Sequence, residues 1–336
     1  MRAWCVVVPR GRAEEVRRAL RDRGLLLKHA EILREGDRIL LPARERVDLG
    51  FPVEQRDVGA TFVPVRSYKD VVRVPDRLRP LLPSSFDVIG DVAVLKIPEE
   101  LEAHRAEIGR AILAWNPKVR VVARDRGVSG GLRIRDVEVV AGEPRTTTVH
   151  VEYGLRYHVD VARAYFSPRL GTERMRVARQ VAPGEAVADP FAGVGPYAIL
   201  IARRADPARV VAADANPEAV ALLRRNVAAN RADRVEVGEG DARDILASVG
   251  PVDRVILDLP HRAMEFLPDA LGALGPHGTV HMYGILEDAE REARALEVRY
   301  LVEGSGRTAE EVRLHDVRAY SPSQHHVAFD VRVGPG

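Results

Sequence analysis

A glycine-rich turn followed by two carboxylates is the strongest chemical feature of the sequence. The segment DPFAGVGPYA at 189–198 follows a short apolar run, and Gly193 and Gly195 stand where a tight strand-to-helix turn lets a ligand approach the backbone. Asp214 ends the next apolar segment, where nucleotide-binding folds place a carboxylate that accepts from both ribose hydroxyls. Asp241 follows the third apolar segment, placed to cap an adenine edge. The spacing predicts a site for an adenosine-containing cofactor.

The charge of Asp189 indicates which cofactor binds. A dinucleotide such as NAD would lay its pyrophosphate on this turn, where the Asp189 carboxylate would repel it. S-adenosylmethionine carries no phosphate, and the carboxylate would attract its ammonium and sulfonium cations. We therefore expect S-adenosylmethionine, with NAD binding and a plain turn role for Asp189 as the alternatives.

Asp258, Leu259 and Pro260 form a second motif, at the end of the fourth apolar segment. Open α/β sheets bind and transform ligands at the carboxyl ends of their strands. Methyltransferases that act on planar nitrogen commonly carry Asn, Asp or Ser followed by any residue and Pro at this place. The polar side chain can hold an N–H group while the proline shapes a flat slot. A lone tripeptide means little, so its position is what favours a catalytic role for Asp258 and Pro260.

Alternating strands and helices are expected to position these motifs. Such alternation predicts a doubly wound parallel sheet. The closing segment 313–333 reads as two strands with no helix between them, which would end the sheet antiparallel. The expected strands are 186–188, 210–213, 235–238, 254–257 and 279–283, and the expected helices are 172–181, one from 195, 217–230 and 262–274.

The length of 336 residues suits two or three domains. Residues 1–62 read as a small α/β unit with a strand at 4–8 and a helix at 13–23, and residues 70–150 as a middle α/β domain. Residues 151–336 hold the motifs above. The expected fold class is α/β, with a C-terminal Rossmann-like class I methyltransferase sheet preceded by two smaller α/β domains.

Composition excludes several classes of protein. Cys5 is the only cysteine, so neither an internal disulfide nor a cysteine-rich zinc site can form, and we expect no metal. No run approaches the roughly 18 apolar residues of a membrane span, and the N-terminus has too short an apolar part for a secretory signal. We expect a cytoplasmic protein with no membrane partner, and a monomer.

Local charge carries the argument for RNA, because 51 basic against 49 acidic residues leave a net charge of only +2. A basic cluster surrounds the glycine-containing segment 127–131, with only Asp125 opposing it locally, and predicts contacts to RNA phosphates. Arginine is abundant throughout, so a solvated surface remains the alternative. The expected RNA-binding residues are Lys118, Arg120, Arg124, Arg126, Arg135 and Arg145.

Four segments together resemble the archaeal and eukaryotic tRNA (guanine-N1)-methyltransferases that modify position 37, beside the anticodon. They are LRIR at 132–135, AGEPRT at 141–146, VDVARAYFSPRLGTER at 159–174 and DPFAGVGPY at 189–197. YFSPRLGTER is the most specific of them, and the resemblance covers nearly the whole chain. It implies tRNA as the partner and an N-terminal domain that checks the tRNA elbow.

The resemblance also implies roles for single residues. Arg133 corresponds to the arginine that holds O6 of the target guanine, and Glu173 to the base that takes the N1 proton. Guanine N1 is protonated at neutral pH, so a base must act before N1 can attack a methyl group. Arg133 as a surface arginine and Glu173 as a first-turn helix carboxylate are the alternatives. The residues expected at the cofactor are Tyr165, Arg169, Asp189, Phe191, Ala192, Gly193, Gly195, Asp214, Ala215, Asn216, Asp241, Ala242 and Asp258.

One position departs from the family pattern. The family usually has Asn-Leu-Pro where this chain has Asp258-Leu-Pro, so the first residue of the motif differs. An ionised aspartate accepts from guanine N1–H or the exocyclic amine but cannot donate to O6, so Asp258 could share the base function. His325 and His326 are expected to be surface or packing residues.

Two other functions remain open from sequence. A related wybutosine-pathway enzyme transfers the aminocarboxypropyl group of the same cofactor, but it typically lacks the motif at 258–260. A non-catalytic RNA-binding protein of the same fold is the third hypothesis, and the presence of Asp189, Asp214 and Glu173 argues against it. The expected function is therefore methylation of N1 of guanosine 37 in tRNA.

Overall fold

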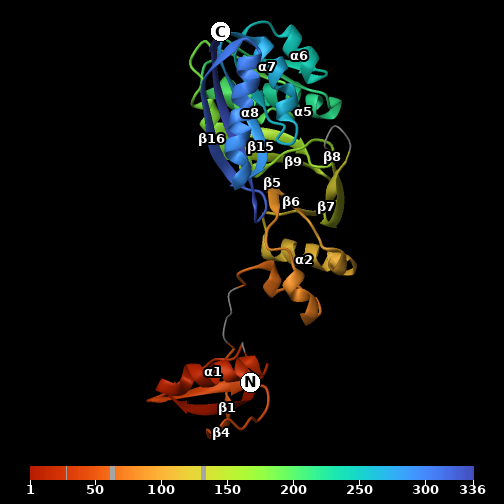
Figure 1. Ribbon diagram of the computed structural model, residues 1–336. Coiled ribbons are helices and arrows are strands. Elements are labelled where there is room, and N and C mark those ends of the chain that lie inside the picture. The colour runs from red at the N-terminus through yellow and green to blue at the C-terminus, as the bar shows by residue number, and fades with distance from the viewer. Residues whose placement is uncertain (28, 61–64, 130–133) are drawn as a thin grey trace. The chain divides into compact units, whose positions relative to one another are not determined.

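The computed structural model of the protein describes residues 1–27, 29–60, 65–129 and 134–336. These form two compact units, Met1–Asp70 and Val71–Gly336 (Figure 1). Each unit is described by itself. Besides the elements below, short 3-10 helices cover Arg10–Arg12, Tyr68–Asp70, Asp76–Leu81 and Asp288–Glu290.

The first unit is an antiparallel sheet covered by one helix. The sheet order is β2-β3-β1-β4, and the helix is α1. Val16 and Leu20, one helical turn apart, are the buried residues of α1, and they pack on Val6 and Val8 of β1. The bounds are β1 Arg2–Pro9, α1 Ala13–Asp22, β2 Leu33–Glu35, β3 Arg38–Ala43 and β4 Val53–Asp57.

The second unit begins with a mixed sheet of order β5-β6-β7-β8, on which α2 packs. Gly90 in the β5–β6 turn has a φ of +57°, and a Cβ there would lie 2.2 Å from the Thr148 hydroxyl, so only glycine fits. The turn therefore lies directly against β9. The bounds are β5 Asp87–Ile89, β6 Val92–Leu95, a 3-10 helix Glu99–His104, α2 Arg105–Trp115, β7 Val121–Ser129 and β8 Ile134–Gly142.

The hairpin of β9 (Thr147–Glu152) and β10 (Leu155–Asp160) is held by two asparagines. Asn226 accepts from the backbone amide of His158 at 2.6 Å and donates to its carbonyl at 3.0 Å. Asn230 makes the same pair with Arg156 at 2.8 and 2.7 Å. Because the asparagines are one helical turn apart and their partners two residues apart, a helix face here completes the hydrogen bonds of a strand edge.

The largest sheet has seven strands in the order β13-β12-β11-β14-β15-β17-β16. The first five pair in parallel, whereas β17 is antiparallel to both β15 and β16. The carboxyl ends of the parallel strands therefore meet at one edge. The bounds are β11 Ala186–Asp189, β12 Arg209–Asp214, β13 Val235–Glu239, β14 Val252–Leu257, β15 Leu274–Glu287, β16 Arg307–Ala319 and β17 Gln324–Pro335.

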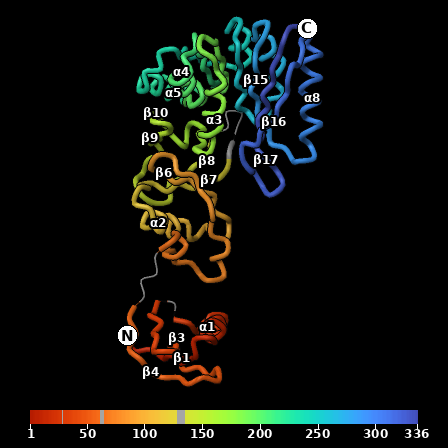
Figure 2. The backbone as a smooth tube through the Cα atoms, turned by 90° about the vertical axis from the view of Figure 1, so that its left-hand side faces the viewer, coloured from red at the N-terminus to blue at the C-terminus, as the bar shows by residue number. Residues whose placement is uncertain are grey.

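Helices cover both faces of this sheet, as Figure 2 shows for α4 and α5 on one side and α8 on the other. Along β11, Val187 belongs to one hydrophobic core and Ala188 to the opposite one, so both faces are buried. The bounds are a 3-10 helix Pro168–Leu170, α3 Gly171–Ala178, α4 Pro196–Arg204, α5 Pro217–Asn230, α6 Ala242–Ser248, a 3-10 helix Ala263–Phe266, α7 Leu267–Ala273 and α8 Arg291–Gly304.

The expected doubly wound sheet and its antiparallel end are confirmed, and α5 has the expected bounds. The expected helix at 262–274 is instead a 3-10 turn followed by α7, and the expected strand at 279–283 is the centre of a longer β15. Helices α6 and α8 were not expected from the sequence. Among the described residues, no helix is long and apolar enough to span a membrane.

Candidate functional site

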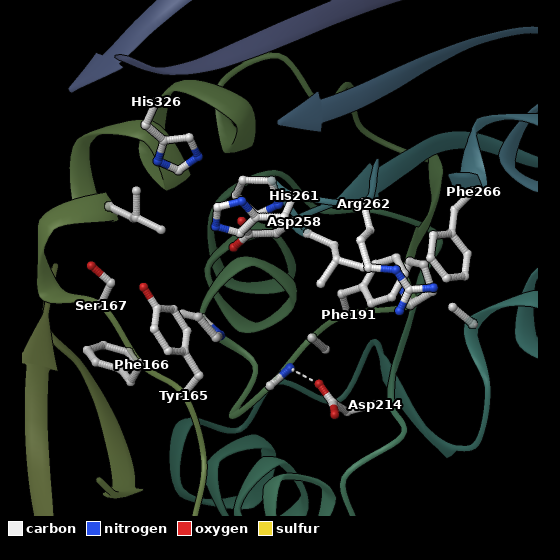
Figure 3. A pocket seen from close by; sticks show the side chains of 18 of the residues that line it. Tyr165, Phe166, Ser167, Phe191, Asp214, Asp258, His261, Arg262, Phe266 and His326 are labelled. Carbon is white, nitrogen blue, oxygen red and sulfur yellow. Dashed lines mark hydrogen bonds between the residues drawn. The ribbon is translucent and has the colours of Figure 1, made fainter. Parts of the chain in front are cut away.

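A deep pocket opens at the carboxyl edge of the large sheet (Figure 3). Its walls come from several segments, and two groups of them face each other as the glycine-turn side and the hairpin side. The glycine-turn side follows β11, β12 and β13 and consists of Pro190, Phe191, Ala192, Gly193, Pro196, Asp214, Ala215, Asp241 and Ala242, with Phe266. The hairpin side includes Ile285 of β15, Arg318, Tyr320 and His326 around the β16–β17 turn, and His261.

The glycines of the turn are required by its geometry. Gly193 and Gly195 have φ angles of +54° and +90°, which L side chains rarely adopt. Gly195 is also the N-cap of α4, and a Cβ there would lie 2.3 Å from a Leu223 methyl group. The chain can therefore turn from β11 into α4 tightly enough to leave open the space in front of it.

Asp214 is fixed in the pocket by the backbone. Its Oδ2 accepts from the amide of Gly193 at 2.8 Å, drawn as a dashed line in Figure 3, and its Oδ1 from the amide of Asn216 at 2.9 Å. Burial raises the pKa of the carboxyl, although these backbone hydrogen bonds oppose the rise. The remaining lone pairs can accept from a pair of hydroxyls, as a ribose presents them.

Asp189 provides the test of whether a cationic cofactor fits. Its side chain is fully buried, and neither carboxylate oxygen forms a hydrogen bond with the described residues. Burial raises its pKa well above the ordinary value, and the nearby Asp258 and Asp214 carboxylates raise it further. Three acidic groups so close together suit a ligand that brings positive charge, as S-adenosylmethionine does.

An apolar slot lies beside Asp241, which is the N-cap of α6 and accepts from the Arg243 amide at 2.9 Å. Phe191 and Phe266 line the slot in an edge-to-face pair with centroids 4.9 Å apart. The Arg243 guanidinium covers Phe266 at 4.4 Å from the ring centroid. Flat apolar walls beside a carboxylate are suited to an adenine ring with its amino group.

The hairpin side of the pocket carries aromatic groups. Figure 3 shows His326 on one side, Phe266 on the other, and Asp258 and His261 between them. Tyr320 is half exposed at 48%, and its ring meets that of His261 edge-on at 6.1 Å. His326 is buried and contacts the Tyr283 ring at 5.6 Å, so it is a pocket residue as well as a packing residue. These groups offer surfaces on which a second flat ring could stack.

Glu173 lies behind the pocket wall rather than in it. The side chain is 5% exposed, and both of its oxygens accept hydrogen bonds from Arg176 at 2.7 Å. Oε1 also accepts from the Tyr283 hydroxyl at 2.8 Å. The next residue, Arg174, does line the pocket; it is ion-paired with Glu152 at 2.9 Å.

The pocket contains most of the residues expected at the cofactor, and four of them lie elsewhere. Asp189 is buried at the end of β11, Gly195 is the N-cap of α4, and Asn216 is the N-cap of α5. Arg169 is paired with Asp87 at 2.5 Å. Asp258 and Pro260 line the pocket, whereas Arg133 lies outside the described residues. Pocket residues that were not expected from the sequence as site residues are Phe166, Ser167, Leu170, Arg174, Pro190, Pro196, Leu259, His261, Arg262, Phe266, Ile285, Arg318 and Tyr320.

The expected RNA-binding cations are largely paired with carboxylates from distant segments. Arg124 lies between Glu102 and Glu138 and is 15% exposed. Lys118 and Arg120 are exposed. The other pairs are Arg120–Glu143 at 3.6 Å, Arg126–Asp136 at 2.6 Å, Arg135–Asp87 at 3.6 Å, Arg145–Asp91 at 2.5 Å and Arg145–Glu143 at 2.7 Å. Among the described residues, no group of three or more His, Cys, Asp or Glu side chains is arranged to hold a metal ion.

The sheet order and the acid-lined pocket at its carboxyl edge define a class I S-adenosylmethionine-dependent methyltransferase. Over 330 residues the chain is 40% identical to the tRNA (guanine(37)-N(1))-methyltransferase Trm5b of Pyrococcus abyssi. This match covers 98% of each chain. The chain belongs to the TRM5/TYW2 methyltransferase family, whose methyltransferase-domain model matches residues 148–303.

The remaining parts of the chain also match family models. Residues 5–49 match the tRNA methyltransferase 5 N-terminal domain, and residues 68–146 match the TYW2 N-terminal domain. The crystal structure of Pyrococcus abyssi Trm5b is similar with a TM-score of 0.75 at 39% identity, over 99% of both chains.

Two further relatives bear on the substrate. A structure described as the complex of aTrm5 and tRNALeu has a TM-score of 0.69 at 30% identity, and the match covers 98% of this chain and 99% of that one. A tRNA(Phe) (4-demethylwyosine(37)-C(7)) aminocarboxypropyltransferase of Pyrococcus horikoshii is 31% identical, over 77% of this chain and 93% of its own.

Proposed function

We propose that the protein is a tRNA (guanine-N1)-methyltransferase that transfers a methyl group from S-adenosylmethionine to N1 of guanosine 37. The observation that carries the proposal is similarity over the full length of a named enzyme of this activity, 98% of both chains. The chain's membership of the TRM5/TYW2 family supports the cofactor, and so do the acidic groups that surround the pocket. We propose that the enzyme works as a cytoplasmic monomer without a metal ion.

The chemistry divides among few groups. When bound, the cofactor supplies an electrophilic methyl group on a sulfonium. In the proposed reaction Glu173 takes the proton from guanine N1 and so frees the N1 electron pair for the methyl group, whose sulfur carrier would leave as a neutral thioether. Arg133 donates to O6, which carries the developing negative charge.

Asp258 and Pro260 line the pocket at the end of β14, on the path between the cofactor groups and the hairpin side. We propose that Asp258 accepts from an N–H of the guanine and that Pro260 forms part of a flat slot for its ring. The aromatic rings of His261 and Tyr320 lie next to this slot, and an RNA base can stack on them.

Transfer of the aminocarboxypropyl group is the competing reaction. The relative of that activity matches 77% of this chain, whereas the methyltransferase relative also covers the N-terminal unit. The Trm5 N-terminal match at residues 5–49 favours methylation for the same reason. We propose that residues 1–62 contact tRNA away from the anticodon, that residues 70–150 form a middle domain, and that residues 151–336 perform the chemistry.

Mass spectrometry of tRNA transcripts after incubation with S-adenosylmethionine tests the reaction. A transcript with guanosine at position 37 should gain one methyl group on its Watson–Crick edge, and a matched transcript with adenosine there should gain none. Adenine has no proton on N1, and its amine would face Arg133 donor to donor, which leaves buried groups unpaired. Gain of an aminocarboxypropyl group would assign the competing reaction, and equal methylation of adenosine would contradict the roles of Arg133 and Glu173.

A second test concerns the assigned catalytic groups. Arg133→Ala and Glu173→Gln should each lower the single-turnover methylation rate by on the order of a hundredfold, because each removes a group needed only in the transition state. Calorimetry should show nearly unchanged affinity for S-adenosylmethionine. A full rate for Glu173→Gln at neutral pH would move the base elsewhere, with Asp258 as the next candidate.

A further inference from the structure

A buried polar cluster lies behind the pocket and surrounds Glu173. It consists of Tyr197, Glu173, Arg176, Tyr283 and Asp330, from α4, α3, β15 and β17. The Tyr197 hydroxyl donates to that of Tyr283 at 2.8 Å, and the Tyr283 hydroxyl donates to Glu173 Oε1 at 2.8 Å. The carboxylate can only accept, so it sets the direction of the whole chain of hydrogen bonds.

Both tyrosines are held as donors. Burial raises the pKa of Tyr283 and of Tyr197 well above the ordinary value, so their hydroxyls stay protonated across the working range of pH. Tyr283 is 2% exposed, and its position on β15 is fixed by pairing with β17. Water therefore does not replace Glu173 as the acceptor for its hydroxyl.

Arg176 is fixed from the opposite side. Its Nη2 donates to Asp330 Oδ1 at 2.9 Å, while Gln180 and His281 donate to the same carboxylate at 3.0 and 2.6 Å. Burial acts to raise the pKa of Asp330, but the hydrogen bonds from His281 and Arg176 outweigh it and hold the pKa well below the ordinary value. The Asp330 carboxylate thus holds the Arg176 guanidinium against the Glu173 carboxylate.

These contacts leave one acceptor position on Glu173. A carboxylate has about four lone-pair sites, two on each oxygen. Oε1 uses both, toward Tyr283 and Arg176 Nη2, and Oε2 uses one, toward Arg176 Nε. Within the described part of the chain, the site left over is therefore on Oε2.

We infer that Tyr283 and Arg176 are positioning residues that fix the orientation of the Glu173 carboxylate and leave Oε2 to accept the proton of the substrate. This inference rests on the proposed function, in which Glu173 is the base. Other charged or titratable groups around the cluster are Arg174 on α3, His281 on β15, His315 on β16, His326 on β17 and Asp258 after β14.

The test compares two tyrosine variants in the full-length enzyme. Tyr283→Phe removes one hydrogen-bond donor from the Glu173 carboxylate. The acidic limb of the pH–rate profile for single-turnover methylation should therefore move up by about one pH unit. The rate on the plateau should fall by up to about tenfold. Tyr157→Phe is the matched control, because Tyr157 is equally buried and its hydroxyl donates to the Pro196 carbonyl, at 3.4 Å, and not to Glu173. It should leave the limb in place.

Arg176→Gln provides a second variant, with Arg179→Gln at the exposed end of the same helix as its control. Arg176→Gln should lower the rate more than Tyr283→Phe, since it removes two donors. Calorimetric affinity for S-adenosylmethionine near that of the wild type would show that each variant is folded.

The outcomes separate the inference from the proposed function. A wild-type enzyme that does not methylate guanosine 37 contradicts the proposed function before any variant is compared. An active wild type with an unmoved limb in Tyr283→Phe and a full rate in Arg176→Gln would overturn the positioning roles alone. If the acidic limb of the pH–rate profile moved equally in Tyr157→Phe, the shift would come from general packing. That result would also overturn the positioning roles.

Discussion

The Asp214 carboxylate at the end of β12 accepts from the backbone amide of Gly193 in the preceding turn, with 2.8 Å between Oδ2 and N. One hydrogen bond thus joins the end of the second strand to the turn after the first. The turn and the carboxylate that we propose as the ribose-binding group are therefore held together.

This link makes Asp214→Ala a direct test of the cofactor site. The change removes the acceptor for a ribose and leaves the Gly193 amide without its partner, so affinity for S-adenosylmethionine should fall by roughly tenfold or more. Isothermal titration calorimetry measures it. Asp233→Ala, at an exposed position outside the pocket, is the control and should bind normally. Unchanged affinity in Asp214→Ala would mean that the cofactor binds elsewhere.

The glycine-turn side of the pocket could be predicted from the sequence because its signals are local. A short apolar strand, two glycines and a carboxylate after each following strand are contiguous patterns, and parallel strands bring their ends to one edge. The hairpin side gave no such signal. Ile285, Arg318 and His326 reach the pocket only because β17 runs back beside β15.

Charge pairing between distant segments could not be predicted from local sequence patterns either. Around Arg124, the sequence shows only Asp125 as an opposing charge, yet Glu102 and Glu138 neutralise it from 22 and 14 residues away. Glu173 presents the same difficulty. Its spacing suggests a helix carboxylate, and the partners Tyr283 and Asp330 of its cluster come from strands more than 100 residues later.

Tyr320 should contribute to RNA binding through stacking. Its ring is half exposed at the pocket mouth against His261, and base–aromatic stacking is worth about 1–3 kcal/mol per base. Tyr320→Ala should therefore raise KM for tRNA by roughly fivefold or more and leave the affinity for S-adenosylmethionine unchanged, whereas Tyr320→Phe should keep both. Tyr300→Ala, on the exposed face of α8, is the control. Equal KM values for Tyr320→Ala and Tyr300→Ala would contradict a role for Tyr320 in stacking on RNA.

Deletion of residues 1–62 tests the role proposed for the N-terminal unit. The two units have separate cores, so the truncated enzyme should fold and bind S-adenosylmethionine normally. Methylation of full-length tRNA should weaken through KM, because one of two linked contacts is lost. On a short anticodon stem-loop, full-length and truncated enzymes should perform alike. A full-length advantage that persists on the stem-loop would place the contact near the anticodon instead.

Asp189 should show opposite effects on stability and on binding. In the cofactor-free protein its pKa is raised, first by burial and then by Asp258 and Asp214, so the folded state holds this proton more tightly than the unfolded chain. The free energy of unfolding that it contributes must therefore fall as pH rises from the ordinary value of 3.8 toward the raised pKa. A cofactor with positive charge reverses the balance, because it favours the ionised carboxylate.

Asp189→Asn should accordingly raise the melting temperature of the cofactor-free protein relative to the wild type as pH rises from 5 to 8, since a neutral amide of the same volume cannot ionise in the buried site. The same change should weaken S-adenosylmethionine binding by roughly tenfold or more, because the attraction to its cations is lost. Thermal unfolding with and without cofactor at pH 5 and pH 8 measures both effects, and the variant should lose pH dependence that the wild type shows. Asp253→Asn, outside the pocket near the amino end of β14, is the control. A variant that is less stable yet binds the cofactor as tightly as the wild type would contradict the placement of a cation beside Asp189.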